Sequence, residues 1–192
     1  MIQRFIMLII FFLMYNSYAQ KLKATIHFRD GTSLEGYGYT QKNKIKFRLE
    51  SEEEYDTWTD LMVKEIDFFW YKNQQTFRYV DIKNRLKYTL LKVIIEGEYT
   101  LYGKLVPEVI YSDTPFGFSQ AVRSPDNKNL RKYYLHKKGE KKYLEIPKIR
   151  SKKYMRKLFN DCEYFSERFD DGEFKNNTLA EIVDYYNYFC ID

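Results

Sequence analysis

The chain has 192 residues, of which 36 are aromatic, and its formal net charge at pH 7 is +5. This aromatic content of 19% excludes a disordered chain, because disordered chains lack the large apolar side chains that form a core. Eight Gly and four Pro exclude a fibrous or linker-like chain. With only two His and two Cys, most catalytic and metal-binding chemistries lack the residues that they need.

The first 19 residues have the layout of a secretory signal peptide. Arg4 precedes an apolar run over residues 5–15, and the small residues Ser17 and Ala19 precede a cleavage site at Gln20. As a helix this run spans about 16 Å, which is shorter than the roughly 30 Å hydrocarbon core of a bilayer. Because residue 20 is not Cys, no lipid anchor is expected. The sequence therefore predicts export to a periplasm or out of the cell.

Residues 21–106 have the alternation of antiparallel strands. Apolar and polar residues alternate over 24–29, Asp30-Gly31 suits a tight turn, and residues 32–39 return as the second strand of a hairpin. The alternation slips by one position between Leu90 and Leu91, which predicts a bulge near Leu90. Further strands are expected over residues 44–50, 61–70, 77–82, 86–95 and 99–106.

The segment over residues 107–129 is rich in Pro, Ser, Asp and Asn and predicts a long loop without regular strands. A final strand pair is expected over 130–136 and 142–146.

After residue 148 the apolar residues no longer recur at every second position and instead recur at the spacing of a helix. Two helices are expected, one before and one after the break at Asp171-Gly172, and Thr178 with Glu181 predicts a capping box at the start of the second. The predicted fold class is α+β. A strongly bent antiparallel β-rich region, resembling a small barrel or a roll, covers residues 20–148, and a two-helix unit covers 149–192.

Cys162 and Cys190 each lie on the apolar stripe of one predicted helix. In the oxidising compartment that the signal peptide implies, they are expected to form a disulfide. Closing this loop would stabilise the fold by about 3.5 kcal/mol. The alternative is two free thiols packed as small apolar groups.

The sequence contains no motif for a hydrolase nucleophile, a phosphate-binding loop, a dinucleotide site or a zinc protease. His27 and His136 both fall in predicted strands, as structural histidines do. The acidic run over residues 51–60 lacks the spacing of an EF-hand and reads as a solvated loop rather than a cation site. No catalytic residue, metal or cofactor is therefore expected.

Charge is unevenly distributed near the C-terminus. Residues 121–157 hold 14 Lys or Arg and three acids, a local net charge of +11, whereas residues 158–192 have a net charge of −7. A basic segment with interleaved aromatics is typical of proteins that bind anionic polymers. Export makes nucleic acid an unexpected partner, so an anionic glycan or lipid headgroup is expected. The alternative is that the basic segment packs beside the acidic helices. The predicted binding surface is Tyr133, Tyr134, His136, Lys137, Lys138 and Tyr143.

The segments ATIHFRDGTSLEGYGY, LLKVIIEGEYTLYGK, FNDCEYFSERFDDGEF and LAEIVDYYNYFC resemble a group of small exported proteins of Bacteroidota-type bacteria that have no assigned activity. The resemblance implies an exported protein with a Cys162 to Cys190 bond and supplies no catalytic residue. More weakly, a strand, Asp30-Gly31 and a strand with Gly36 are similar to the Sm-like and SH3-like small barrels. This second resemblance implies a curved sheet and does not imply RNA binding.

The sequence thus favours a non-enzymatic binding or structural component of the cell envelope. An accessory subunit of an envelope complex is the alternative. A hydrolase built on carboxylates is a third hypothesis, and it would need a deep cleft in which two acids converge.

Overall fold

The computed structural model describes residues 22–50, 54–70, 73–83, 86–105, 130–147 and 151–191. The strands are β1 (Lys23–Phe28), β2 (Ser33–Gln41), β3 (Lys44–Arg48), β4 (Asp56–Trp58), β5 (Val63–Trp70), β6 (Asn73–Val80), β7 (Thr89–Ile95), β8 (Tyr99–Leu105), β9 (Leu130–Lys137) and β10 (Tyr143–Ile146). The helices are α2 (Ser151–Leu158), α3 (Glu163–Asp170), the 3₁₀ turn η2 (Glu173–Lys175) and α4 (Leu179–Phe189). The predicted signal peptide and the predicted loop over 107–129 lie outside the described residues.

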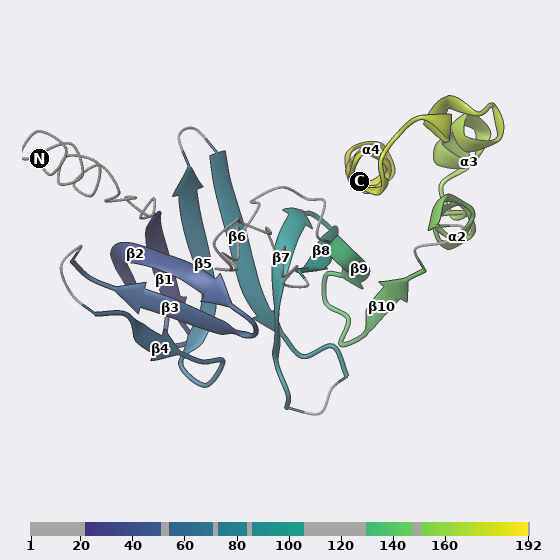
Figure 1. Cartoon of the computed structure of the whole chain (residues 1–192). Helices are drawn as coiled ribbons and strands as arrows, with labels where there is room; N and C mark the ends of the chain where they lie inside the picture. Colours follow the sequence, from purple (N-terminus) through teal and green to yellow (C-terminus); the bar gives the residue numbers. More distant parts are fainter. Residues whose placement is uncertain are drawn as a thin grey trace, which may run out of the picture.

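All of these strands belong to one antiparallel sheet, in the order β10-β9-β8-β7-β6-β5-β1-β2-β3-β4 (Figure 1). The helices gather beside the end of the sheet that holds β8 to β10. The predicted α+β class is confirmed. Within the described residues no helix has the length and apolar character needed to cross a membrane.

The predicted first hairpin is confirmed. Gly31 adopts a left-handed φ of 91°, which is the reason that the turn uses glycine. The Asp30 carboxylate accepts hydrogen bonds from the backbone N–H of Thr32 at 2.9 Å and from its hydroxyl at 2.7 Å. These bonds stabilise the ionised carboxylate and lower the pKa of Asp30.

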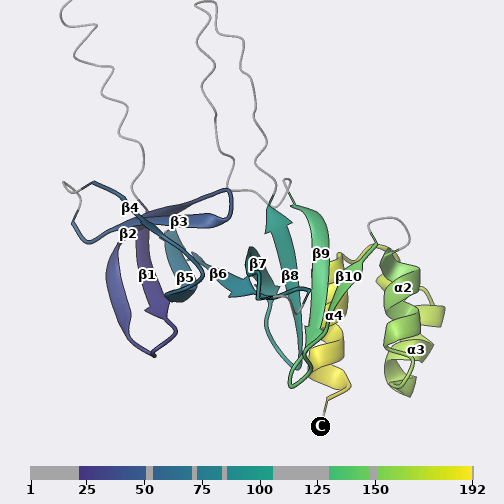
Figure 2. The same cartoon turned by 90° about the horizontal axis from the view of Figure 1, so that it is seen from below.

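The sheet is strongly bent over β1 to β6, as the sequence predicted for the β-rich region (Figure 2). A Cβ atom at Gly36 would lie 2.2 Å from the carbonyl oxygen of Arg48 in β3. The turn between β2 and β3 folds back over the sheet, and the Asn43 side chain accepts from the N–H of Leu90 at 2.7 Å and donates to the carbonyl of Tyr88 at 3.0 Å. Figure 2 shows β1 to β5 curled together at one end of the molecule. The bend does not close the sheet into the small barrel that the prediction allowed, because β4 and β10 remain at opposite edges.

The bend encloses a first core on the inner face of β1 to β7. Its buried members are Ala24, Ile26, Ile45, Phe47, Val63, Ile66, Phe68, Phe77, Tyr79 and Leu90. In β1, β3 and β6 they alternate with less buried polar residues, as the period of two predicted, whereas in β5 Val63 and Ile66 are three positions apart.

The predicted bulge near Leu90 was wrong. The pairing of β6 with β7 is continuous from Val80 to Phe77, and the irregularity lies later, between Val93 and Ile95. Leu90 and Leu91 are both buried, but Leu90 belongs to the first core and Leu91 to a separate cluster with Val80. The adjacent apolar residues Leu90 and Leu91 therefore indicate a strand that is buried on both faces, not a bulge.

The acidic segment also contains a strand that the sequence did not predict. β4 is only three residues long, and it pairs with β3 through Trp58 opposite Ile45. A strand this short has too few positions to show a period of two.

The C-terminal unit has three short helices in place of the two that were predicted. The first predicted helix is interrupted after Leu158, and Cys162, with extended backbone, caps the start of α3. Asn160 and Asp161 occupy the break, and such residues favour turns and caps over helix interiors. Phe159 lies before the break and Phe165 after it, and both pack in the same core. The helical spacing of apolar residues therefore continues through the break.

A second core joins the helices to the sheet. Phe159 stacks on Tyr186 at a centroid distance of 3.9 Å, and Tyr99 of β8 contacts both rings edge-on. The Asn187 side chain accepts from the N–H of Tyr99 and donates to its carbonyl oxygen, both at 2.8 Å. These contacts fix α4 against β8, and Figure 2 shows α4 along this part of the sheet, with α2 and α3 farther out.

Candidate functional site

The predicted binding surface is divided between the two faces of β9. Tyr133 packs against the core under the helices, whereas Tyr134 is buried on the opposite face. His136 shares that opposite face with Tyr143, and their rings stack at 4.4 Å. The structure therefore brings together Tyr134, His136 and Tyr143, and it places Tyr133 elsewhere.

The two predicted lysines lie at the end of β9. The Lys137 ammonium lies 5.6 Å from the centre of the Tyr99 ring, and Lys138 is exposed in the turn toward β10. Burial raises the pKa of the Tyr143 hydroxyl to about 12, and the nearby Tyr102 adds to this rise. The Tyr143 hydroxyl therefore stays protonated at physiological pH, and the ring that stacks on His136 is uncharged.

Part of the basic segment is neutralised within the fold. Arg156 of α2 forms hydrogen bonds of 3.0 and 2.6 Å with the two carboxylate oxygens of Asp170 in α3. Lys132 pairs with Glu145 at 2.7 Å across β9 and β10. The first of these pairs joins two helices of the C-terminal unit, whereas Lys132 of the basic hairpin pairs with an acid of the hairpin itself.

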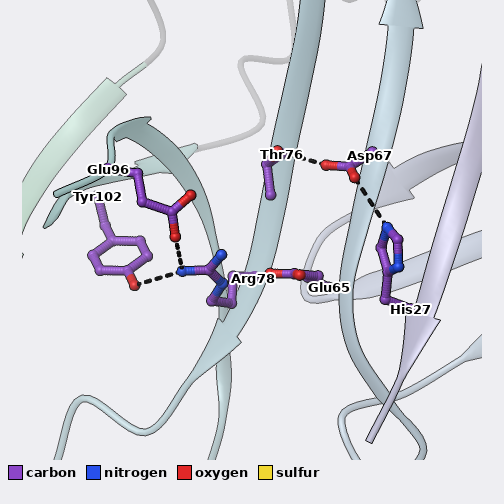
Figure 3. Close-up of polar contacts among 7 residues, drawn as sticks. All are labelled: His27, Glu65, Asp67, Thr76, Arg78, Glu96 and Tyr102. Carbon is purple, nitrogen blue, oxygen red and sulfur yellow. Dashed lines mark hydrogen bonds and ion pairs between the residues drawn. The ribbon is translucent and has the colours of Figure 1, made fainter. Parts of the chain in front are cut away.

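A row of polar side chains crosses the outer face of β1, β5 and β6 (Figure 3). The imidazole Nε2 of His27 lies 3.0 Å from a carboxylate oxygen of Asp67, and the hydroxyl of Thr76 donates to the other oxygen at 2.5 Å. Among the described residues no serine, threonine or cysteine side chain hydrogen-bonds to His27. This arrangement joins three strands and lacks the nucleophile that a catalytic triad requires.

Arg78 is the centre of the second half of this row. Its guanidinium lies 2.5 Å from Glu65 and 2.9 Å from Glu96, and it donates to the Tyr102 hydroxyl at 3.4 Å (Figure 3). Burial by itself would lower the pKa of Arg78, but the hydrogen bonds to Glu65, Tyr102 and Glu96 raise it above its ordinary value. The row is therefore paired within itself and stabilises the sheet.

The described residues also offer no cluster of three or more His, Cys, Asp or Glu side chains of the kind that holds a metal ion. Glu52 and Glu53 of the predicted acidic loop lie outside the described residues.

Exposed rings gather on α3 and α4 instead. Tyr188 is 79% exposed, Phe189 50% and Tyr164 47%. We call Tyr164, Arg168, Tyr185, Tyr188 and Phe189 the aromatic patch. Exposed single apolar residues are ordinary, but a group of large rings on one surface marks an interaction site.

The rings of the aromatic patch contact one another. Tyr164, Tyr185 and Phe189 are in mutual contact, with centroid distances of 6.2 Å for Tyr164 to Tyr185, 4.5 Å for Tyr185 to Phe189 and 5.9 Å for Tyr164 to Phe189. Tyr188 meets Phe189 edge-on at 4.7 Å. The rings therefore restrict one another, so little side-chain entropy remains to be lost on binding.

Arg168 fixes the polar ends of two of these rings. One of its guanidinium nitrogens, Nη1, donates to the hydroxyls of Tyr164 and Tyr185, each at 3.0 Å. Its Nε donates to Glu173 at 2.5 Å, and these hydrogen bonds raise the pKa of Arg168 above its usual value. Burial also raises the pKa of the Tyr185 hydroxyl. Arg168 thus stays charged and holds the two hydroxyls in place.

The predicted disulfide between Cys162 and Cys190 is confirmed, and it fixes the edge of the aromatic patch. Cys162 caps the start of α3 and Cys190 the end of α4, so the bond joins opposite ends of two helices. Tyr164 lies two residues after one cysteine, and Phe189 lies directly before the other. Of the described cysteines none is free.

Only a weak signal in the sequence indicated the aromatic patch. Tyr185, Tyr188 and Phe189 are close together in the chain, but Tyr164 and Arg168 join them only through the fold. The i to i+4 spacing of Tyr164 and Arg168, followed by ring residues near the next cysteine, was the available signal.

Comparisons of this chain with models of protein families, with curated proteins and with solved structures found no match. The resemblance to exported proteins of Bacteroidota-type bacteria, and the weaker one to small barrels, stay predictions.

Proposed function

We propose that this chain is an exported, non-enzymatic binding protein of the cell envelope that docks on another envelope protein through the aromatic patch. The observation that carries this proposal is the contact of Tyr164, Tyr185 and Phe189 on one exposed surface, with Tyr188 and Arg168 beside them. Tyr and Arg are enriched among the residues that dominate binding energy at protein interfaces.

The charges around the aromatic patch favour a protein over the anionic partners that the sequence first suggested. Glu163, Glu167 and Asp184 are exposed on the same two helices. A polyanionic glycan or an anionic membrane would be repelled by these acids. The partner that fits is a protein with an apolar centre and a basic rim, because such a rim would pair with these carboxylates.

The predicted signal peptide and the disulfide both support the proposed location in the cell envelope. The predicted signal peptide directs the chain out of the cytosol, and a disulfide persists in an oxidising compartment. The paired acids and bases of the outer sheet face support a structural role for that face, which leaves the helices as the contact region.

The proposal is tested by mild chemical crosslinking in the native envelope, followed by purification of the chain and mass spectrometry of its adducts. We expect one dominant adduct with an exported protein. It should fall about tenfold when Tyr164 and Tyr188 are both changed to Ala, which corresponds to about 1.4 kcal/mol of binding free energy.

The matched control changes Leu61 and Leu86 to Ala, since these residues are exposed apolar side chains remote in sequence from the helices. The control variant should keep the adduct. Adducts only between copies of this chain, or equal loss in both variants, would reject the proposal.

A second candidate, retention on an anionic glycan, rests on the turn between β9 and β10. Lys138, Lys141 and Lys142 are exposed there beside Glu140. Salt-sensitive retention on an anionic glycan column, lost when these three lysines become Gln, would favour this function. Retention that is unaffected by salt would reject it.

A further inference from the structure

A small cavity opens between α2 and the turn that follows α3. Its volume is about 240 Å³, and none of its lining side chains belongs to the aromatic patch. Four cationic side chains and two phenylalanine rings line it: Lys152, Lys153, Arg156, Lys175, Phe169 and Phe174. Its lining therefore combines cationic and apolar side chains.

Two of the cations build the wall of the cavity. The Lys152 ammonium donates to the carbonyl oxygens of Phe174 at 3.0 Å and Lys175 at 2.5 Å. Arg156 binds both carboxylate oxygens of Asp170. These contacts hold α2 against α3 and η2, so the cavity is fixed by polar contacts on both sides.

The other two cations have no such partner. Neither the Lys153 nor the Lys175 ammonium forms an ion pair or hydrogen bond with the described part of the chain, and both side chains are exposed. Of the nearby acids, Asp170 pairs with Arg156 and Glu173 with Arg168, and Asp171 is exposed beside Gly172, which leaves two lysine ammonium groups against one carboxylate. The mouth of the cavity therefore has an excess of positive charge that favours an anion.

The floor of the cavity is apolar. The rings of Phe169 and Phe174 lie 5.8 Å apart, and Phe174 is buried. Gly172, with a left-handed φ of 82°, reverses the chain between them and so brings the two rings together. An apolar cavity of about 150 Å³ suffices to hold benzene, so this one can hold a ring with a short substituent.

We propose that this cavity binds a compact arylalkanoate, an anion in which a short linker joins one aromatic ring to a carboxylate. The ring packs on Phe169 and Phe174, and the carboxylate lies between the ammonium groups of Lys153 and Lys175. The site adjoins the aromatic patch, because Phe174 contacts Tyr185 edge-on at 5.0 Å, but it shares no lining residue with the patch and the proposal does not rest on the docking function.

The test is a titration of the purified protein with 3-phenylpropanoate, followed by amide chemical shifts in two-dimensional NMR spectra. We expect saturable shifts in α2, α3 and η2 with a Kd of about 1 mM or tighter. The neutral 3-phenylpropan-1-ol should bind about tenfold more weakly, and acetate, which lacks the ring, should give no saturable shift. Equal binding of the acid and the alcohol would contradict the role of the lysines.

The variant with Lys153→Gln and Lys175→Gln tests the charge without touching the core. Its affinity for 3-phenylpropanoate should fall about fivefold or more, while its unfolding temperature stays unchanged. The matched control carries Lys44→Gln and Lys64→Gln, which remove two exposed lysines of the sheet. Absence of saturable shifts in the native protein, shifts confined to the sheet, or equal weakening by the control would overturn the proposal.

Discussion

The curled sheet and the C-terminal helices use their polar and aromatic side chains in different ways. On the outer face of the sheet, His27 pairs with Asp67, and Arg78 is held between Glu65 and Glu96. On the helices, several rings are exposed, Tyr188 the most. The disulfide and Arg168 hold the residues next to these rings in place. This row of the sheet face thus has its polar groups paired internally, whereas the helices present a preorganised surface that the rest of the described residues leave exposed.

The two regions are nevertheless joined through β7. Leu90 packs in the core of the curled sheet, and Ile94 of the same strand packs against the core under the helices. Loss of either core should therefore reach the other through this strand, and the contrast between the regions concerns surface chemistry rather than independent folding.

The largest expected effects come from emptying either core. Phe47→Ala in the curled sheet and Phe159→Ala under the helices remove fully buried rings, and each should lower the free energy of unfolding by about 3–5 kcal/mol. Urea denaturation followed by both circular dichroism and tyrosine fluorescence should give a single transition in each variant. Two separated transitions in Phe159→Ala would show that the helices unfold as a separate unit.

Loss of the disulfide comes next. Replacing Cys162 and Cys190 together by Ser should lower the free energy of unfolding by about 3.5 kcal/mol, because the unfolded chain gains the freedom of an open loop. Urea denaturation measures this loss, and the single Cys190→Ser variant, which breaks the bond but keeps the Cys162 sulfur at the start of α3, separates it from the loss of that sulfur contact. Mass spectrometry of the non-reduced native protein that found two alkylatable thiols would contradict the bond itself.

Asn187 tests the contact between α4 and the sheet. Asn187→Ala leaves the N–H and carbonyl of Tyr99 without the partners that they have in the native fold, and it should cost about 1–3 kcal/mol. Asn160→Ala, at an exposed position, should change the free energy of unfolding by less than about 0.5 kcal/mol. Amide hydrogen exchange at Tyr99 should accelerate only in Asn187→Ala, and equal exchange in the two variants would show that the contact is not formed.

The smallest effect belongs to the capping box of α4. The Thr178 side chain accepts from the N–H of Glu181, and the Glu181 carboxylate accepts from the N–H of Thr178 at 2.6 Å. Thr178→Ala should therefore cost about 1 kcal/mol at neutral pH, whereas Thr178→Ser should retain the cap.

The same box gives a pH dependence with a definite sign. Hydrogen bonds from the backbone and side chain of Thr178 lower the pKa of Glu181 from 4.5. Their stabilisation is therefore complete above pH 4.5 and is lost as the pH falls through the lower pKa of the folded state. The difference between the native protein and Thr178→Ala should shrink in acid, and a difference that grew in acid would contradict the assignment.

Local chemistry was predictable from the sequence. The Asp30-Gly31 turn, the Thr178 capping box and the cysteine pair were all predicted correctly, because each depends on a few neighbouring residues or on a strong pairing rule.

Features that depend on which elements pack against a strand or a helix could not be predicted from neighbouring residues. The slip at Leu90 and Leu91 reads equally as a bulge or as a strand buried on both sides, and only the fold decides between them. The break before Cys162 was hidden because the apolar spacing continued through it. The aromatic patch forms only where α3 packs on α4. The spacing of residues along a single helix does not predict that packing.

The most direct test of the central contrast places a photo-crosslinking amino acid at one exposed position in each region, Tyr188 on the helices and Gln74 on the sheet, in the native envelope. Our account predicts a single dominant adduct with another exported protein from position 188 and none from position 74. An adduct from position 74 alone would contradict it, because the partner would then contact the sheet and not the aromatic patch.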